Sequence, residues 1–250
     1  MALIEKLTAV ADAIRGKTGG TEKLTLDQMA TEIEVIESDK LTHFLDGSLL
    51  EINTNATILR NYAFYYSAIT SINGPNVTQT GSYCFQYSSK LKTVYLPVLS
   101  KAAARSFQDC KALEEISLPG ITDETIHSGL FINCKALINV SLPNMHYVKS
   151  EMFLGCSVLP SLDLPAVVQI DSKAFSSCTV LNRLILRSNS LVSLGGVNAF
   201  EKSPFASGGT GGTVYVPSAL VESYKTATNW STLYAAGTCN FVAIEGSEYE

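Results

Sequence analysis

The strongest constraint on this chain is a short leucine-proline phrase that recurs at nearly constant spacing. It reads LKTVYLP, LEEISLP, LINVSLP and LPSLDLP, and these copies begin at Leu91, Leu113, Leu137 and Leu159. Weaker copies begin at Ile69 (ITSINGP) and Leu181 (LNRLILR). Self-similarity with a period of about 20–29 residues is typical of a solenoid, whose stacked units share one apolar interior. Such a stack presents an extended recognition surface more often than a catalytic pocket.

Each phrase has the alternation of a short strand. In the first full copy, Leu91, Val94 and Leu96 are predicted to face the interior, while Thr93 and Tyr95 face solvent. The proline that ends the phrase lacks a backbone N–H, so it ends the ladder of hydrogen bonds. We therefore expect parallel strands about 4.8 Å apart, joined by irregular arcs.

Each arc contains a Phe followed three residues later by Ser or Cys. The pairs are Phe64–Ser67, Phe85–Ser88, Phe107–Cys110, Phe131–Cys134, Phe153–Cys156 and Phe175–Cys178. The Phe is predicted to fill the interior of its coil. Because Ser replaces Cys in the first two pairs, the cysteines are predicted to be buried free thiols and not disulfides. The sequence contains neither a CxxC motif nor a Cys/His cluster of zinc spacing, so we expect no metal and no cofactor.

The two ends of the chain differ from the repeats and divide it into three parts. Residues 1–38 are predicted to form an amphipathic helical hairpin for anchoring or oligomerisation, residues 41–207 the repeats, and residues 208–250 an α/β cap. The apolar stripes of the two expected helices include Leu3, Leu7, Val10, Ile14, Leu26, Met29 and Ile33. So small a hairpin has too little core to stand alone, so it is expected to dock on another surface.

The expected cap follows the GGTGG run at residues 208–212. TVYVP reads as the last strand, Ser218 as the N-cap of a helix over ALVESYKTAT, and Leu220 and Tyr224 as its inner face. The acidic finish EGSEYE is expected to be frayed.

Charge and composition exclude several functions. The net charge is -5 and the basic residues are scattered, which argues against binding nucleic acid or an anionic membrane. No apolar run approaches the roughly 18 residues that span a bilayer. Glu5, Lys6 and Asp12 interrupt the apolar start, so we expect no secretion signal.

The candidate catalytic groups do not form a pattern. His43, His127 and His146 are far apart in the sequence and none follows a nucleophile motif. Glu114 and Glu115 are adjacent on an expected strand, so they point to opposite faces. We therefore expect a protein that is not an enzyme.

Two groups of residues are candidates for recognition. Outward strand positions form two columns, which are Thr93, Glu115, Asn139, Ser161 and Arg183, and beside them Tyr95, Ser117, Ser141, Asp163 and Ile185. The second group is a crowd of tyrosines, Tyr62, Tyr65, Tyr66, Tyr83 and Tyr87. Tyr65, Tyr66 and Tyr87 are candidate contact residues. The alternative is a structural ladder, with Tyr62 over Tyr83 and Tyr66 over Tyr87.

The repeating unit resembles the BspA-like leucine-rich repeat, which is found in surface and adhesion proteins of bacteria. The residues that carry this resemblance are Leu–x–x–Ile/Val–x–Leu–Pro followed by Phe–x–x–Cys. The resemblance implies a leucine-rich repeat solenoid, mainly β. Two departures predict irregular sheet pairing, namely two extra residues in the arc after Leu113 and Arg187 in place of a proline.

Two further segments resemble leucine-rich repeat proteins encoded in tail regions of phages and prophages of gut Gram-positive bacteria. They are ADAIRGKTGGTEKLTLDQMATEI near the start and VYVPSALVESYKTATNWSTLYA near the end. This resemblance implies a virion or tail-associated protein. Its helices would bind other tail proteins or form a homo-oligomer, with a trimer favoured, and its repeats would bind a host cell-surface protein or glycan. The alternatives are a bacterial cell-surface adhesin, a structural virion spacer, and a glycan-processing enzyme.

Overall fold

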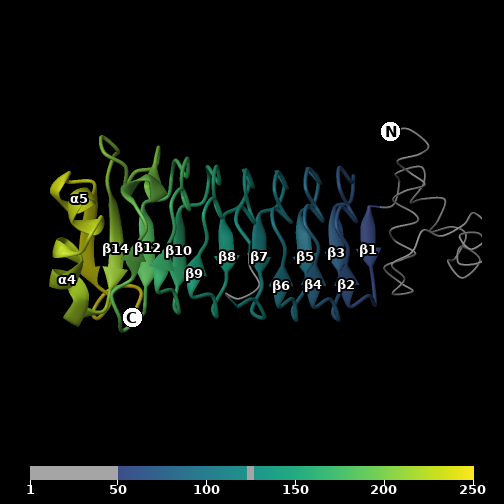
Figure 1. The fold of residues 1–250 in the computed structure, drawn as a ribbon, viewed down its shortest axis with the longest axis horizontal. Coiled ribbons are helices and arrows are strands. Elements are labelled where there is room, and N and C mark those ends of the chain that lie inside the picture. The colour runs from purple at the N-terminus through teal and green to yellow at the C-terminus, as the bar shows by residue number, and fades with distance from the viewer. Residues whose placement is uncertain (1–49, 123–126) are drawn as a thin grey trace, which may run out of the picture.

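The protein is an elongated stack of coils in chain order, closed at its C-terminal end by two short helices (Figure 1). The computed structural model describes residues 50–122 and 127–250. The leucine-rich repeat solenoid predicted from the sequence is confirmed. The predicted hairpin over residues 1–38 lies outside the described residues.

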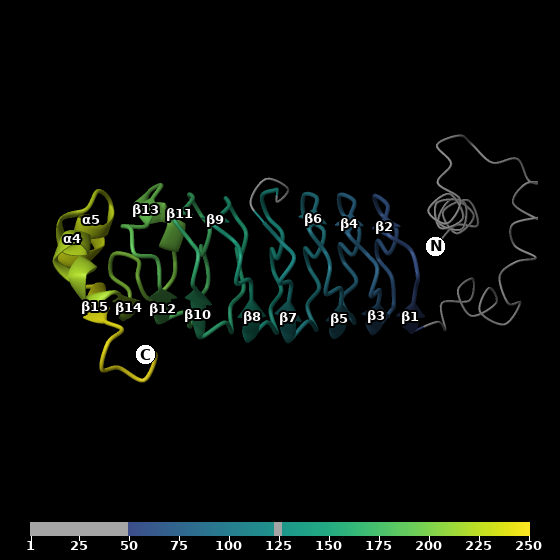
Figure 2. The ribbon, with the colours of Figure 1, turned by 90° about the horizontal axis from the view of Figure 1, so that it is seen from below.

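One side of the stack is a row of parallel strands, whose outward surface we call the strand face (Figure 2). The row consists of β1 (Glu51–Asn53), β3 (Ser71–Asn73), β5 (Thr93–Tyr95), β7 (Glu115–Ser117), β8 (Asn139–Ser141), β10 (Ser161–Leu164), β12 (Arg183–Leu186), β14 (Gly212–Val216) and β15 (Cys239–Ala243). Six of these strands, β3 to β12, come from the leucine-proline phrase and its two weaker copies. As predicted, Leu91 and Leu96 are buried and Thr93 and Tyr95 are exposed.

A second row of two-residue strands lies within the arcs. It consists of β2 (Ile58–Leu59), β4 (Gln79–Thr80), β6 (Lys101–Ala102), β9 (Tyr147–Val148), β11 (Gln169–Ile170) and β13 (Ser193–Leu194). These strands were not predicted from the sequence, because two residues are too few to display an alternating pattern. Their second residue is buried in each case, which fixes the opposite wall of the core.

A column of stacked phenylalanine rings runs through the middle of the coils. The members are Phe64, Phe85, Phe107, Phe131, Phe153, Phe175 and Phe200. Consecutive ring centroids are 5.1–5.7 Å apart and the rings lie within 21° of parallel. From Phe85 onward these rings are fully buried, as predicted.

A second column consists of the small residue three positions after each Phe. The thiol of Cys134 donates a hydrogen bond to the carbonyl oxygen of Phe107 in the preceding coil, at 3.1 Å. Cys110, Cys156 and Cys178 repeat this contact at 3.0–3.2 Å, and Ser88 makes it with its hydroxyl. All six cysteines are free and buried, so the predicted thiol ladder is confirmed.

The strand row is interrupted at two places, between β5 and β7 and between β8 and β10. The irregularity predicted for the arc after Leu113 is wrong, because β7 and β8 flank its two extra residues and still pair in register. The irregularity predicted at Arg187 is wrong, because β12 pairs with both β10 and β14. The second break has a simple cause. Ile138 and Asn182 each donate a backbone N–H to the preceding coil, whereas the equivalent Pro160 has none.

The C-terminal cap continues the same sheet and covers the last coil. Its parts are the 3-10 helices η2 (Val197–Phe200) and η3 (Ser218–Leu220), the helices α4 (Val221–Thr226) and α5 (Trp230–Ala235), and β14 and β15. The buried indole of Trp230 donates to the carbonyl of Val192 at 2.8 Å, and the hydroxyl of Tyr224 accepts from the N–H of Val192 at 3.0 Å. These bonds attach the helices to the last coil.

Three details of the predicted cap are wrong. Ser218 caps no helix with its side chain, and its backbone N–H donates to the carboxylate of Glu245 instead. A further strand, β15, follows the strand predicted to be last. The finish EGSEYE is not frayed, because Tyr249 packs on Tyr215 at 4.6 Å between centroids. The C-terminus lies on the strand side of the stack (Figure 2).

Replacing Phe131 by Ala is expected to lower the free energy of unfolding by about 3–5 kcal/mol. The substitution removes a fully buried ring from the middle of the column and exposes the faces of its two neighbours. Urea denaturation followed by circular dichroism measures this. Val180→Ala is the control, because that side chain is 44% exposed, and we expect a change below about 0.5 kcal/mol. Similar losses of unfolding free energy in both variants would contradict a stabilising role for the phenylalanine column.

Candidate binding surfaces

The strand face brings together most of the residues predicted to form polar columns. Thr93, Tyr95, Glu115, Ser117, Asn139, Ser141 and Asp163 are exposed, and Ser161 and Arg183 are half-buried. Five of them line a shallow groove over β5, β7 and β8, namely Thr93, Glu115, Ser117, Asn139 and Ser141. The groove coincides with the interruption between β5 and β7.

Many polar groups of the strand face already have partners on the neighbouring coil. The amide of Asn139 donates to the carboxylate of Glu115 at 2.7 Å. Arg187 forms an ion pair with Asp163 at 2.9 Å. These contacts fix side chains in place, but they also occupy groups that would otherwise bind a ligand.

The C-terminal end of the strand face is partly covered by the tail of the chain. Arg183 donates to the hydroxyl of Tyr249 at 3.2 Å and lies 3.9 Å from Glu248. Ile185, predicted to be an exposed member of the column, is buried instead. The open part of the strand face therefore ends near β10. The sequence analysis missed this cover, since nothing in EGSEYE indicates a docking site.

The five tyrosines form one connected cluster on the arcs of the first two coils, which we call the tyrosine platform. Tyr62 stacks on Tyr83 with centroids 5.2 Å apart, and Tyr66 stacks on Tyr87 at 4.5 Å. Tyr65 packs its edge against Tyr62, Tyr66 and Tyr87. The predicted ladder geometry is thus confirmed. The platform remains open to solvent, because Tyr62, Tyr65 and Tyr66 are 50%, 39% and 56% exposed.

The backbone under the platform has an unusual conformation. In the arcs of Phe64 to Phe175, the positions two residues before and two residues after the Phe are left-handed, and in the arc of Phe200 the second of them is, with φ of 54–75°. The residues before the Phe are Tyr62, Tyr83, Arg105, Gly129, Glu151 and Lys173. The residues after it are Tyr66, Tyr87, Asp109, Asn133, Gly155, Ser177 and Lys202. The fold therefore requires a left-handed residue at these positions, not an aromatic one.

Tyrosine is unfavourable in the left-handed conformation. A left-handed conformation costs a residue with a bulky side chain about 1–2 kcal/mol, whereas Gly adopts it freely and Asn or Asp adopt it readily. The later arcs include Gly129, Asn133 and Gly155 at these positions. The first two arcs use tyrosine at all four. The glycines and the asparagine two residues before or after Phe131 and Phe153 are the sequence signal for these left-handed positions.

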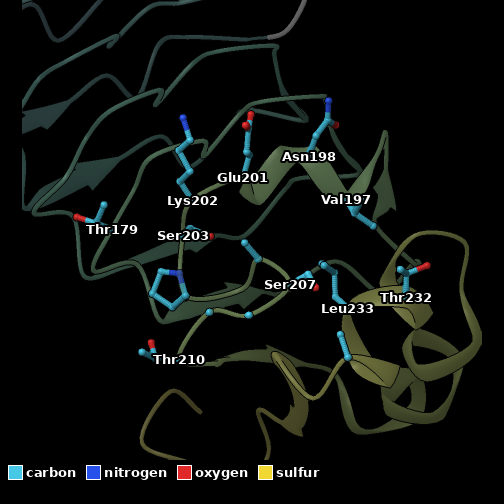
Figure 3. A pocket seen from close by; sticks show the side chains of 15 residues that line it. Thr179, Val197, Asn198, Glu201, Lys202, Ser203, Ser207, Thr210, Thr232 and Leu233 are labelled. Carbon is cyan, nitrogen blue, oxygen red and sulfur yellow. The ribbon is translucent and has the colours of Figure 1, made fainter.

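A cleft lies between the last coil and the cap, with a volume of about 730 Å³ (Figure 3). Val197, Thr232 and Leu233 line it, and the charged ends of Glu201 and Lys202 lie near each other in the view. Its surface is mostly apolar and its lining includes a single acid and a single base. With one carboxylate, the cleft supplies neither a pair of carboxylates nor a set of metal ligands.

The described residues show no cluster of metal-binding side chains. No three His, Cys, Asp or Glu side chains gather in residues 50–122 and 127–250. In the same residues, no helix has the length and hydropathy needed to cross a membrane.

The thiols are poor nucleophiles in the folded state. Desolvation by burial raises the pKa of Cys134 and Cys156 well above their ordinary value, and raises the pKa of Cys178 to about 12. Because the thiolate is the nucleophile, these side chains are poor candidates for covalent chemistry.

Comparison with known proteins identifies the repeats. The family model for the BspA type leucine rich repeat region matches six copies, over residues 22–123, 57–182 and 100–207. The chain belongs to this family. No curated protein sequence matches it.

One solved structure supports the fold, and a second is reported beside it. A leucine rich repeat protein from T. pallidum is 18% identical with a TM-score of 0.53, and the match covers 78% of this chain and 87% of that one. A leucine-rich repeat protein from Bacteroides ovatus is 17% identical with a TM-score of 0.40, covering 80% of this chain and 72% of that one. At this identity the likeness concerns the fold alone.

The buried thiols are expected to make the protein less stable at alkaline pH. A folded-state pKa raised above the unfolded value contributes stability below about pH 9, and that stability is lost as the pH rises towards the folded-state pKa. Urea midpoints measured from pH 7 to pH 11 test this. In a variant with Cys110, Cys134, Cys156 and Cys178 all replaced by Ser, the decline should be shallower. A decline of equal slope in both proteins would contradict a contribution of the buried thiols to this pH dependence.

Proposed function

We propose that this chain is a non-enzymatic recognition protein that binds a protein or glycan on a cell surface through the tyrosine platform. The observation that carries the proposal is the presence of four tyrosines at left-handed positions, where the other arcs hold no aromatic residue. A bulky residue in an unfavourable conformation is often retained at a functional site.

The chemistry of the platform suits recognition. Tyrosine offers a rigid ring with a polar end, so it contributes contact area while few rotatable bonds are immobilised. Tyr65 and its stacked neighbours support one another in fixed orientations. A partner therefore meets a pre-ordered surface, which reduces the entropy lost on binding.

We propose the strand face as a second, broader contact surface. Thr93, Tyr95, Glu115, Ser117, Asn139, Ser141, Ser161, Asp163 and Arg183 are its candidate residues. The groove over β5, β7 and β8 supports this role. The strand face is the weaker candidate, because Asn139 and Asp163 already bond to neighbouring coils and the C-terminal tail covers Arg183.

We also propose that this surface is displayed on a phage or prophage tail. The resemblance of ADAIRGKTGGTEKLTLDQMATEI and of the closing segment to tail-associated proteins supports it. Residues 1–38 would then bind other tail proteins or form a homo-oligomer. A bacterial cell surface is the alternative carrier, in keeping with the surface and adhesion proteins that contain BspA-type repeats.

Replacing Tyr65, Tyr66 and Tyr87 together by Ala is expected to weaken cell binding at least tenfold, a loss of about 1.4 kcal/mol. Labelled protein applied to a panel of gut Gram-positive bacteria and epithelial cells, with flow cytometry, measures the binding. Tyr95→Ala is the matched control, since Tyr95 is 55% exposed but lies on the strand face. A larger loss from the Tyr95 variant would contradict the platform and favour the strand face.

Deleting residues 1–38 is expected to lower the oligomeric mass and leave the repeats folded. Light scattering gives the mass and circular dichroism gives the melting of the repeats. An unchanged mass, together with unchanged incorporation into tail particles, would contradict the anchoring role.

A further inference from the structure

A separate groove lies beside the tyrosine platform, across the second row of strands. It has a volume of about 500 Å³. Its walls include Ile58, Arg60, Asn61, Tyr62, Gln79 and Lys101. Strands β2, β4 and β6 pair in register there, so Ile58, Gln79 and Lys101 form one outward row.

The groove is positively charged in a protein that is negative overall. Arg60 and Lys101 line it, no acidic residue does, and the whole chain has a net charge of -5. The Nε of Arg60 is buried and has no hydrogen-bond partner. Neither cation forms an ion pair within the part of the chain that the structure describes. Two cations without counter-charges attract an anion.

The floor of the groove depends on Gly81. A Cβ at this position would lie 2.3 Å from the backbone nitrogen of Asn61, so no larger residue fits without moving the first coil. Gly81 therefore lets the second coil pack closely against the backbone of Arg60 and Asn61.

We propose that this groove binds an acidic sugar. The carboxylate would accept hydrogen bonds from the guanidinium of Arg60, with Lys101 adding charge. The apolar face of a sugar ring would pack on Tyr62, which the stack with Tyr83 holds in place. The amides of Asn61 and Gln79 supply polar groups for sugar hydroxyls. The inference rests on the proposed function and deepens it, by naming the ligand class.

The geometry favours a glycan over the other polyanions. Lys101 lies two strands from β2, or about 10 Å away, which suits a disaccharide. A nucleic acid needs a longer basic stripe, and this groove has two cations. A peptide of Asp and Glu alone would use the charge but has no ring with an apolar face for Tyr62.

Calorimetric titration of the full chain with 3′-sialyllactose, a hyaluronan tetrasaccharide and lactose tests the proposal. At least one acidic sugar should bind at low salt at least about tenfold more tightly than lactose, and salt should weaken it. The preferred probe distinguishes a sialic acid from a uronic acid. Arg60→Ala should lower the affinity about tenfold or more, and Arg60→Lys should restore part of it.

Lys173→Ala is the control, because Lys173 is a cation on the arc of a distant coil. Circular dichroism melting shows that each variant is folded. Equal affinity for lactose, no effect of Arg60→Ala, or equally tight binding of a tetraglutamate peptide would each overturn the acidic-sugar site. Cell binding that depends on the tyrosines but not on Arg60 would overturn this inference alone. Cell binding that is independent of the tyrosines would overturn the proposed function as well.

Discussion

The stacking of one phenylalanine ring per coil is the interaction on which the rest of the structure depends. Each ring fills the interior of its own coil and covers the ring before it, and the thiol or hydroxyl three residues later binds the preceding Phe carbonyl. Together these contacts fix the spacing of the coils without using any outward residue. The arcs and the strand face are therefore free to vary in sequence, which explains how so regular a core presents such different surfaces along its length.

The left-handed positions beside each Phe show where that freedom is used. Stacking of Tyr62 on Tyr83 and of Tyr66 on Tyr87 contributes about 0.5–1.5 kcal/mol for each pair. The backbone cost of four left-handed tyrosines, at about 1–2 kcal/mol each, is at least as large. The net effect on folding is then near zero or unfavourable. Other bulky residues, namely Arg105, Glu151, Lys173 and Lys202, also adopt this conformation. The tyrosines therefore differ from the other arcs in their aromatic, exposed surface, and a binding role accounts for that difference.

The contacts that repeat along the chain could be predicted from the sequence. Leu91 and Leu96 inside, Thr93 and Tyr95 outside, the plug at Phe131 and the free thiol of Cys134 all follow from a residue type that returns at a fixed interval. Features that occur once could not be predicted in this way. The break at Pro160 depends on one missing N–H, and the contact of Tyr249 with Tyr215 joins residues far apart in the chain. The groove joins Arg60 to Lys101 only after three coils are stacked in register.

The most direct test exchanges the tyrosines of the second arc for the residues that the fourth arc has at the same positions. In that arc Gly129 precedes Phe131 and Asn133 follows it. The double variant Tyr83→Gly and Tyr87→Asn would be compared with the parent chain by urea denaturation and by binding to cells. We predict a free energy of unfolding within about 1 kcal/mol of the parent, together with a clear loss of binding. A large loss of stability with binding retained would contradict the account.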